Sequence, residues 1–188
     1  MILRQFFDED SSTFSYLIAD EATGHALLLD PVLTRYDLYV QLLQELSLTL
    51  LYAIDTHVHA DHITALGKLR LRFRCETVHG EESRASGVSL HVADGDALGL
   101  GDLCLRCLHT PGHTDDSYCF HLAEEKLLFT GDTLLIRTTG RTDFQGGSAG
   151  DLYDSITQRL FTLPDETIVY PGHDYQGRWI TNIMQERT

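Results

Sequence analysis

Histidine and aspartate residues gather in four short segments of the sequence, and each segment directly follows a run typical of a β-strand. Neutral imidazoles and carboxylates are ligands that bind zinc or iron without any thiolate. Because side chains that follow separate strands converge at one edge of an α/β sheet, this pattern predicts a metal site. The segments are residues 56–62 (THVHADH), 110–114 (TPGHT), 129–132 (FTGD) and 170–174 (YPGHD).

The spacing inside the first segment directs several side chains to one place. His57 and His59 are two residues apart and therefore point to the same side of an extended chain. We expect a helix to begin at Asp61, and this change of direction turns Asp61 and His62 toward the same space. In each of the other three segments a glycine directly precedes the histidine or aspartate, which allows a tight turn and close approach of the backbone.

Each of these residues also has an ordinary interpretation when it is taken alone. Asp61 is typical of a helix N-cap, and an isolated His113 or His173 is more often a hydrogen-bonded surface residue. The joint occurrence of the four segments in this order favours a metal site, because it meets the demand for ligands several times over. We interpret the remaining histidines as structural or surface residues: His25, His79, His91, His109 and His121.

The elements that must position these segments alternate between strands and helices. The order predicts sheets that are covered by helices in layers. Hydrophobic alternation and turn residues predict strands at 1–7, 13–19, 26–30, 51–56, 90–92, 103–108, 118–122, 126–130 and 167–170. Helical spacing predicts helices at 38–46, 61–73, 148–160 and from about 179 onward.

Cys104 and Cys107 form a C-x-x-C pair, which elsewhere indicates zinc binding or redox chemistry. Here the pair lies in an alternating, strand-like run. Positions three apart in a strand point to opposite faces, so these two thiols cannot share a metal ion. We therefore expect both to be ordinary strand residues.

Length and charge limit the classes of partner. The 188 residues predict a single domain over 1–188, and the net charge is −14, from 14 basic and 28 acidic residues. Phosphate binding depends on Lys and Arg, so the charge disfavours nucleic acid and acidic membranes as partners. No apolar run reaches the length of a membrane span, and the N-terminal residues do not resemble a signal peptide, so we expect a cytoplasmic protein.

The HxHxDH motif at residues 57–62, followed by the three later segments, resembles the metallo-β-lactamase superfamily. The resemblance covers almost the whole chain, from Met1 to about Arg178. It implies an α/β fold, the αββα four-layer sandwich, with metal ions at one edge. The motif is specific for the superfamily but says little about the reaction.

A further stretch narrows the resemblance to one family. Residues 134–137 (LLIR) and 140–145 (GRTDFQ), together with 56–64 (THVHADHIT), resemble the ETHE1-like persulfide dioxygenases. This resemblance implies oxidation of glutathione persulfide by O2 to sulfite and glutathione at one Fe²⁺ ion per chain. It implies His57, His113 and Asp132 as iron ligands, a set with two histidines and one carboxylate. The same family implies contacts to these ligands from His59, Asp61, His62 and His173.

The resemblance also identifies candidates for substrate binding. Arg141 is the best candidate for a glutathione carboxylate, because its planar guanidinium matches that group. The alternative is a structural ion pair, with Asp143 as the partner. Tyr175 resembles a family tyrosine near the substrate, and packing is nearly as good an explanation for it.

Other functions remain open at this point. In a glyoxalase II-like thioester hydrolase, His59, Asp61, His62 and His173 would complete a site for two Zn²⁺ ions that activates water. Glyoxalase II enzymes have a C-terminal helical domain, whereas only 15 residues follow His173 in this sequence. A non-catalytic metal or sulfide sensor is a third alternative. Relatives usually continue beyond the position of Thr188, so a truncated tail is one explanation of the C-terminus. Homodimers are common in the family, but no residue in the sequence establishes one.

Overall fold

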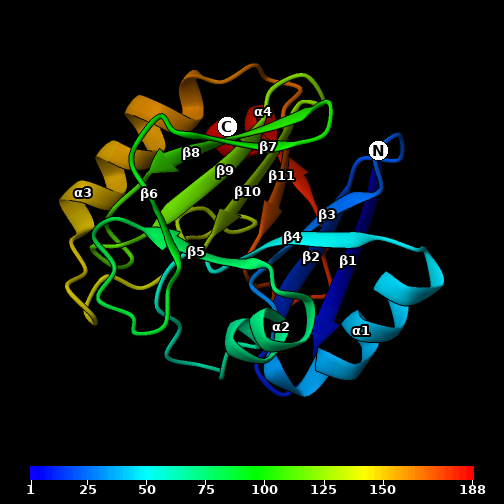
Figure 1. The fold of residues 1–188 in the computed structure, drawn as a ribbon. Coiled ribbons are helices and arrows are strands. Elements are labelled where there is room, and N and C mark those ends of the chain that lie inside the picture. Colours follow the sequence, from blue (N-terminus) through cyan, green and yellow to red (C-terminus); the bar gives the residue numbers. More distant parts are fainter.

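A computed structural model describes residues 1–188 and has four layers (Figure 1). Two six-stranded sheets pack face to face, with α1 (Tyr36–Glu45) and α2 (Leu66–Phe73) on the outer side of the first. The outer side of the second sheet is covered by α3 (Ala149–Asp154) and α4 (Ile183–Arg187). This arrangement confirms the predicted αββα sandwich.

Each sheet is built mainly from consecutive strands. The order is β1-β2-β3-β4-β5-β6 in the first sheet and β12-β11-β10-β9-β8-β7 in the second. The first sheet contains β1 (Ile2–Asp8), β2 (Thr13–Ala19), β3 (His25–Leu29), β4 (Thr49–Ile54), β5 (Glu76–Gly80) and β6 (Leu90–Val92). The second contains β7 (Ala97–Leu100), β8 (Leu103–His109), β9 (Tyr118–Leu122), β10 (Leu127–Gly131), β11 (Ile168–Pro171) and β12 (Thr181–Asn182).

Side chains alternate between the two faces of a strand, so alternate residues of β2 pack into different hydrophobic cores. In β2, Tyr16 and Ile18 belong to the core between the two sheets, whereas Leu17 and Ala19 pack against the helices. Tyr39 and Leu43 of α1 lie one helical turn apart and bury the same face against that sheet. Packing on both sides of the sheet explains why β2 is buried along its whole length.

Strand direction brings the four predicted segments to one edge. In the second sheet, β10 is parallel to β11, and β8 runs in the same direction because both β8 and β10 are antiparallel to β9. In the first sheet, β4 is parallel to its neighbours β3 and β5. The carboxyl ends of β8, β10 and β11 therefore lie together, and the segment after β4 joins them.

Several predicted elements differ from the structure. The helix predicted from residue 61 was wrong at its start, because residues 59–65 are irregular and α2 begins at Leu66. The helix predicted near residue 179 was also wrong, since Thr181–Asn182 forms β12 before α4 begins at Ile183. The strands β5 and β7 were not predicted. The helix start at Ser148 is confirmed, because its side chain accepts a hydrogen bond from the backbone N–H of Asp151.

The cysteine interpretation agrees with β8. Cys107 is buried between the sheets, while Cys104 is only partly buried and points to the other face. All four cysteines are free thiols.

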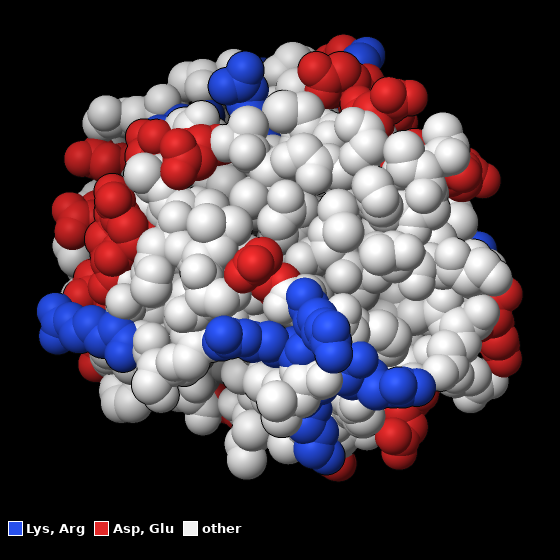
Figure 2. Space-filling model, in the orientation of Figure 1, with Lys and Arg blue, Asp and Glu red and all other residues white.

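Charge is distributed unevenly over the surface. Figure 2 shows a group of Lys and Arg side chains over α2, where Lys68, Arg70, Arg72 and the following Arg74 are all exposed. Cations in the last turn of a helix interact favourably with its dipole. The net charge of −14 thus describes the chain as a whole and not each of its faces. No helix has both the length and the apolar composition needed to cross a membrane.

Candidate metal centre

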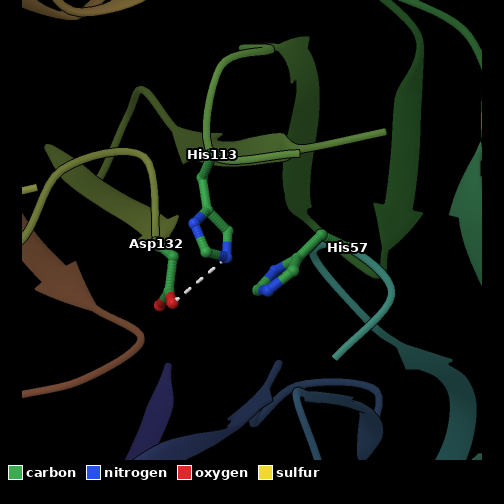
Figure 3. Close-up of side chains that lie close together, drawn as sticks. All are labelled: His57, His113 and Asp132. Atoms are coloured by element: carbon green, nitrogen blue, oxygen red, sulfur yellow. Dashed lines mark ion pairs between the residues drawn. The ribbon is translucent and has the colours of Figure 1, made fainter. Parts of the chain in front are cut away.

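His57, His113 and Asp132 converge although they come from three separate segments (Figure 3). One potential ligand atom from each residue lies within 4.8 Å of those of the other two. His113 Nε2 is 3.5 Å from Asp132 Oδ2, and the rings of His57 and His113 stand edge to face with centroids 4.9 Å apart. The structure therefore brings together the three residues that the family resemblance implies as metal ligands.

Close backbone packing makes this convergence possible. His57 follows β4, His113 follows β8 and Asp132 follows β10. At Gly172, which follows β11, an added Cβ would lie 2.5 Å from Asp132 Oδ1, and its N–H donates to the carbonyl oxygen of Gly131 at 2.7 Å. A side chain at position 172 would therefore displace the Asp132 carboxylate.

The protonation of the two imidazoles suits a metal. His113 Nδ1 donates to the carbonyl oxygen of Arg141 at 2.7 Å, so its Nε2, which faces Asp132, is the nitrogen with the free lone pair. Burial, with contributions from the neighbouring imidazoles of His59 and His113, holds the pKa of His57 well below its usual value. His57 is therefore neutral at pH 7, as a metal ligand must be.

Three buried polar atoms near the centre have no hydrogen-bond partner. They are His59 Nδ1, His62 Nε2 and Asp132 Oδ1. Buried polar atoms are rarely left unpaired, and an ion is one of the standard reasons for such an exception. Together with two imidazoles and a carboxylate, they make the cluster a fit for a divalent metal ion.

The other predicted residues lie next to this cluster. Asp61 Oδ2 accepts hydrogen bonds from His62 Nδ1 at 2.9 Å and from Thr13 Oγ1 at 3.0 Å. His173 Nε2 is 3.6 Å from Asp61 Oδ2 and 3.5 Å from Asp132 Oδ1. Burial raises the pKa of Asp61, but the adjacent imidazoles outweigh it and hold that pKa below its usual range.

His59 differs from His57 in what it faces. Its Nε2 is 3.0 Å from Asp30 Oδ1, and its ligand atoms also lie near Asp55. Burial lowers the pKa of His59, but the carboxylates of Asp30, Asp55 and Asp61 raise it to about 10. The first two histidines of the motif thus lie in opposite electrostatic surroundings.

A cavity of about 560 Å³ opens beside the cluster. Asp132, His113, Arg141 and Tyr175 line it. Arg141 is exposed and forms a two-pronged ion pair with Asp143, at 2.7 Å from Nε and 2.9 Å from Nη2. Tyr175 stacks on the His173 ring at 5.8 Å. Arg141 therefore lines the cavity and is paired with Asp143, the partner expected for the structural alternative.

Four residues that hold the histidine segment were not recognised from the sequence. Asp116 Oδ2 accepts from Val58 N–H at 3.2 Å, and Gln145 Nε2 donates to the Val58 carbonyl at 3.0 Å. Asp30 and Thr56 contact the first two histidines of the motif. The only signal for Asp30 was an acidic residue at the end of an apolar strand and before a proline.

Comparison with known proteins identifies relatives over the whole chain. Residues 8–173 match the profile of the Metallo-beta-lactamase superfamily. The human "Persulfide dioxygenase ETHE1, mitochondrial" is 46% identical over 191 residues, which covers 100% of this chain and 74% of the human protein. A hydroxyacylglutathione hydrolase from Francisella tularensis subsp. novicida is 31% identical and covers 97% of this chain and 69% of its own length.

Comparison with solved structures also identifies a relative that matches over the whole chain. The crystal structure of ETHE1 from Myxococcus xanthus superimposes with a TM-score of 0.96 at 55% sequence identity, covering 100% of this chain and 82% of that one. The chain therefore belongs to the metallo-β-lactamase superfamily and, within it, to the ETHE1-like family.

Proposed function

We propose that this chain is a persulfide dioxygenase that oxidises glutathione persulfide with O2 to sulfite and glutathione and uses one Fe²⁺ ion. The observation that carries the proposal is the convergence of two imidazoles and one carboxylate within 4.8 Å, in a chain that resembles persulfide dioxygenases over its full length. Two histidines and one carboxylate form the ligand set of many iron oxygenases, which leaves positions for two co-substrates.

We assign the iron to His57, His113 and Asp132. Bound iron supplies the one-electron and O2 chemistry that redox-inactive zinc lacks. The chain's own contribution is positioning: His113 keeps Nε2 free by donating Nδ1–H to the Arg141 carbonyl. Four further residues surround the ligands, namely His59, Asp61, His62 and His173. Of these, His173 Nε2 is 3.5 Å from Asp132 Oδ1, and the centroid of the His59 ring is 4.2 Å from that of His57.

We assign the persulfide to the cavity beside Asp132. Arg141 lines this cavity and has the planar donor geometry that a carboxylate of glutathione requires. Tyr175 is 71% exposed and stacks on the His173 ring. The stacking holds the tyrosine ring in position, and its exposed face is available to the substrate. Local positive charge at Arg141 and at the metal would attract an anionic persulfide to an otherwise acidic protein.

Oxygen consumption tests the proposal. Protein loaded with Fe²⁺ should consume O2 on addition of glutathione persulfide and release sulfite, while the same protein loaded with Zn²⁺ should not. The absence of O2 uptake in a preparation with one iron per chain would contradict the proposed activity.

A thioester hydrolase with two Zn²⁺ ions is the second candidate. The observation that favours it is the second group of ligand atoms, from His59, Asp61 and His62, which also lie within 4.8 Å of one another. Metal analysis separates the two functions. About one iron per chain after anaerobic purification supports the dioxygenase, and two zinc ions with thioester cleavage support the hydrolase.

The cellular location and the oligomeric state belong to the proposal as well. We predict a cytoplasmic protein, and fractionation of the source cells tests this directly. Light scattering of the purified chain would test a homodimer, the state common in the family.

A further inference from the structure

The backbone of the histidine motif is anchored at a single residue. Residues 57–62 lie outside every helix and strand, and none of their backbone N–H or carbonyl groups bonds to another backbone group. Val58 alone among them has side-chain partners for its backbone. Its N–H donates to Asp116 Oδ2 at 3.2 Å, and its carbonyl oxygen accepts from Gln145 Nε2 at 3.0 Å. Two side chains from elsewhere in the chain therefore hold the backbone of this segment.

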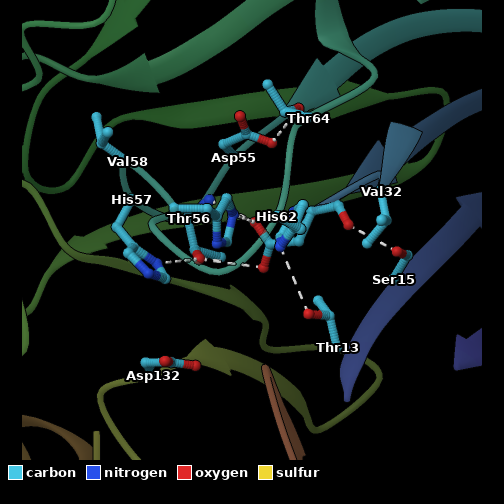
Figure 4. A network of polar contacts seen from close by, with 12 residues as sticks. Thr13, Ser15, Val32, Asp55, Thr56, His57, Val58, His62, Thr64 and Asp132 are labelled. Atoms are coloured by element: carbon cyan, nitrogen blue, oxygen red, sulfur yellow. Dashed lines mark hydrogen bonds and ion pairs between the residues drawn. The ribbon is translucent and has the colours of Figure 1, made fainter. Parts of the chain in front are cut away.

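Val58 lies between the first two histidines of the motif. Its side chain points away from Asp132, whereas His57 points toward that carboxylate (Figure 4). The N–H of Val58 belongs to the peptide unit shared with His57, and its carbonyl belongs to the unit shared with His59. Because each peptide unit is planar and moves as one body, a shift of Val58 changes the direction of an imidazole. The rings of His57 and His59 are 4.2 Å apart between centroids, so the two move together.

The two anchors come from different parts of the site. Asp116 is buried, 4% exposed, and lies three residues after His113, so it joins the first histidine segment to the second. Gln145 lies in the loop after β10 that also contains Arg141, and it lines the cavity proposed for the persulfide. Gln145 is therefore a direct link between the substrate cavity and the backbone of the metal-binding motif.

The loop is tightly turned at Gln145. This residue has φ = +47°, in the left-handed region that residues other than glycine rarely adopt. The N–H of Gly147 donates to the Phe144 carbonyl at 2.9 Å, and a Cβ at Gly147 would lie 2.9 Å from the His113 carbonyl oxygen. Such strain persists where the surroundings hold it in place, and it is common at functional sites. The turn thus contacts the His113 segment through Gly147 and the Val58 backbone through Gln145.

We propose that Gln145 is a positioning residue that couples the substrate cavity to the metal centre. Its amide holds the Val58 carbonyl, so the loop with Arg141 and the motif with His57 keep each other in place. A ligand that orders the loop then strengthens metal binding, and by thermodynamic reciprocity the metal strengthens binding of the ligand by the same factor. The inference rests on the proposed function, because it takes the cavity as the site for glutathione.

Ligand coupling can be measured in the full chain. The probe is S-methylglutathione, which keeps both carboxylates of glutathione but has a thioether in place of the persulfide. Co²⁺ is titrated against a competing chelator with and without saturating probe. We expect the probe to tighten Co²⁺ binding by about fivefold or more in the unsubstituted protein. In Gln145→Met, which keeps the length of the side chain but has no N–H donor, this factor should fall toward one.

Two further variants complete the experiment. Gln145→Asn tolerates the positive φ, but its amide is one methylene shorter, so it should lose the coupling as Gln145→Met does. Gln5→Met is the matched control. Gln5 is also partly buried and also donates Nε2 to a backbone carbonyl, that of Trp179 at 3.0 Å, but it forms no hydrogen bond with the histidine motif. Gln5→Met should keep the full coupling factor.

The anchor itself can be measured without any ligand. Amide hydrogen exchange at Val58 reports how often this segment opens. Loss of one neutral hydrogen bond should make this exchange about 2- to 10-fold faster in Gln145→Met and weaken Co²⁺ binding by a similar factor. Neither quantity should change in Gln5→Met.

The outcomes separate the role of Gln145 from the proposed function. An equal coupling factor in the unsubstituted protein and in folded Gln145 variants overturns this role, and so does an equal loss in Gln145→Met and Gln5→Met. Failure of S-methylglutathione to bind the unsubstituted protein contradicts the proposed glutathione site. In that case unaltered Val58 exchange and Co²⁺ affinity in the Gln145 variants would show that Gln145 does not position the motif, and changes in both would show that it does.

Discussion

The side chain of His113 is bonded to the backbone of Arg141: Nδ1 donates to the carbonyl oxygen at 2.7 Å. One hydrogen bond therefore joins a proposed metal ligand to the loop that lines the substrate cavity. Because the acceptor is backbone, the bond does not depend on the identity of residue 141. It depends on how closely the loop approaches His113, and Gly140 sets that approach.

Substitution of Gly140→Ala should weaken metal binding. An added Cβ would lie 2.4 Å from the Asp132 carbonyl oxygen and 2.7 Å from His113 Nδ1, so the loop or the imidazole must move. We expect an iron dissociation constant weakened about tenfold or more, measured by chelator competition. Gly67→Ala in α2 is the control, since its Cβ would meet nothing within 4 Å. Unaltered iron binding by Gly140→Ala would show that the loop moves to accommodate the added methyl group and that His113 stays in place.

Asp143 should reduce the affinity for an anionic substrate by occupying Arg141. Arg141 Nε and Nη2 both donate to the Asp143 carboxylate, and both side chains are mostly exposed. Ion pairs between exposed side chains are weak, so Asp143→Asn should lower the KM for glutathione persulfide by no more than about fivefold. Arg141→Ala should raise that KM about tenfold or more with a smaller effect on kcat, because a charged hydrogen bond to the substrate is lost. A KM that rises in Asp143→Asn would contradict this role for Asp143.

Removal of Asp132 should abolish metal binding. Asp132→Ala leaves two imidazoles without the carboxylate that neutralises the ion, and we expect iron content to fall from about one per chain to near zero, with loss of O2 uptake. Elemental analysis and uptake are measured on the same sample. Glu124→Gln, an exposed acidic residue in the β9–β10 turn, is the control. If Asp132→Ala lost its metal and yet kept its biological function, the non-catalytic sensor would be favoured over the enzyme.

The metal cluster could be predicted because its ligands follow strands in a recognisable order. His57, His113 and Asp132 each come directly after a strand or within a few residues of one, and parallel direction then places them at one edge. The start of α2 could not be predicted in the same way. Residues 59–65 are held by tertiary contacts, such as the bond from Thr64 Oγ1 to Asp55 at 2.9 Å, which replace the expected helical turn.

Asp30 shows where the sequence alone is insufficient. Its importance depends on the parallel register of β3 with β4, which places it next to Thr56, 26 residues later in the chain. A local pattern contains no information about such pairing. The strand β5 (ETVHG) was missed for a related reason, since it is buried on both faces and lacks the alternation that marks a half-exposed strand.

Asp8 should make stability depend on acidic pH. Burial raises its pKa, but hydrogen bonds from Thr34 and Ser11 and the charge of Arg35 outweigh burial and hold the pKa below the usual 3.8. A depressed folded pKa stabilises the protein above the unfolded value, and this stabilisation is lost as the pH falls through the folded pKa. We therefore expect Asp8→Asn to lower the free energy of unfolding by about 1–3 kcal/mol at pH 7, with the deficit shrinking below about pH 4. Urea unfolding at both pH values measures this, and exposed Asp10→Asn in the same segment should show no such deficit. A deficit that stayed constant down to about pH 2.5 would mean that packing, and not the charge of Asp8, stabilises the end of β1.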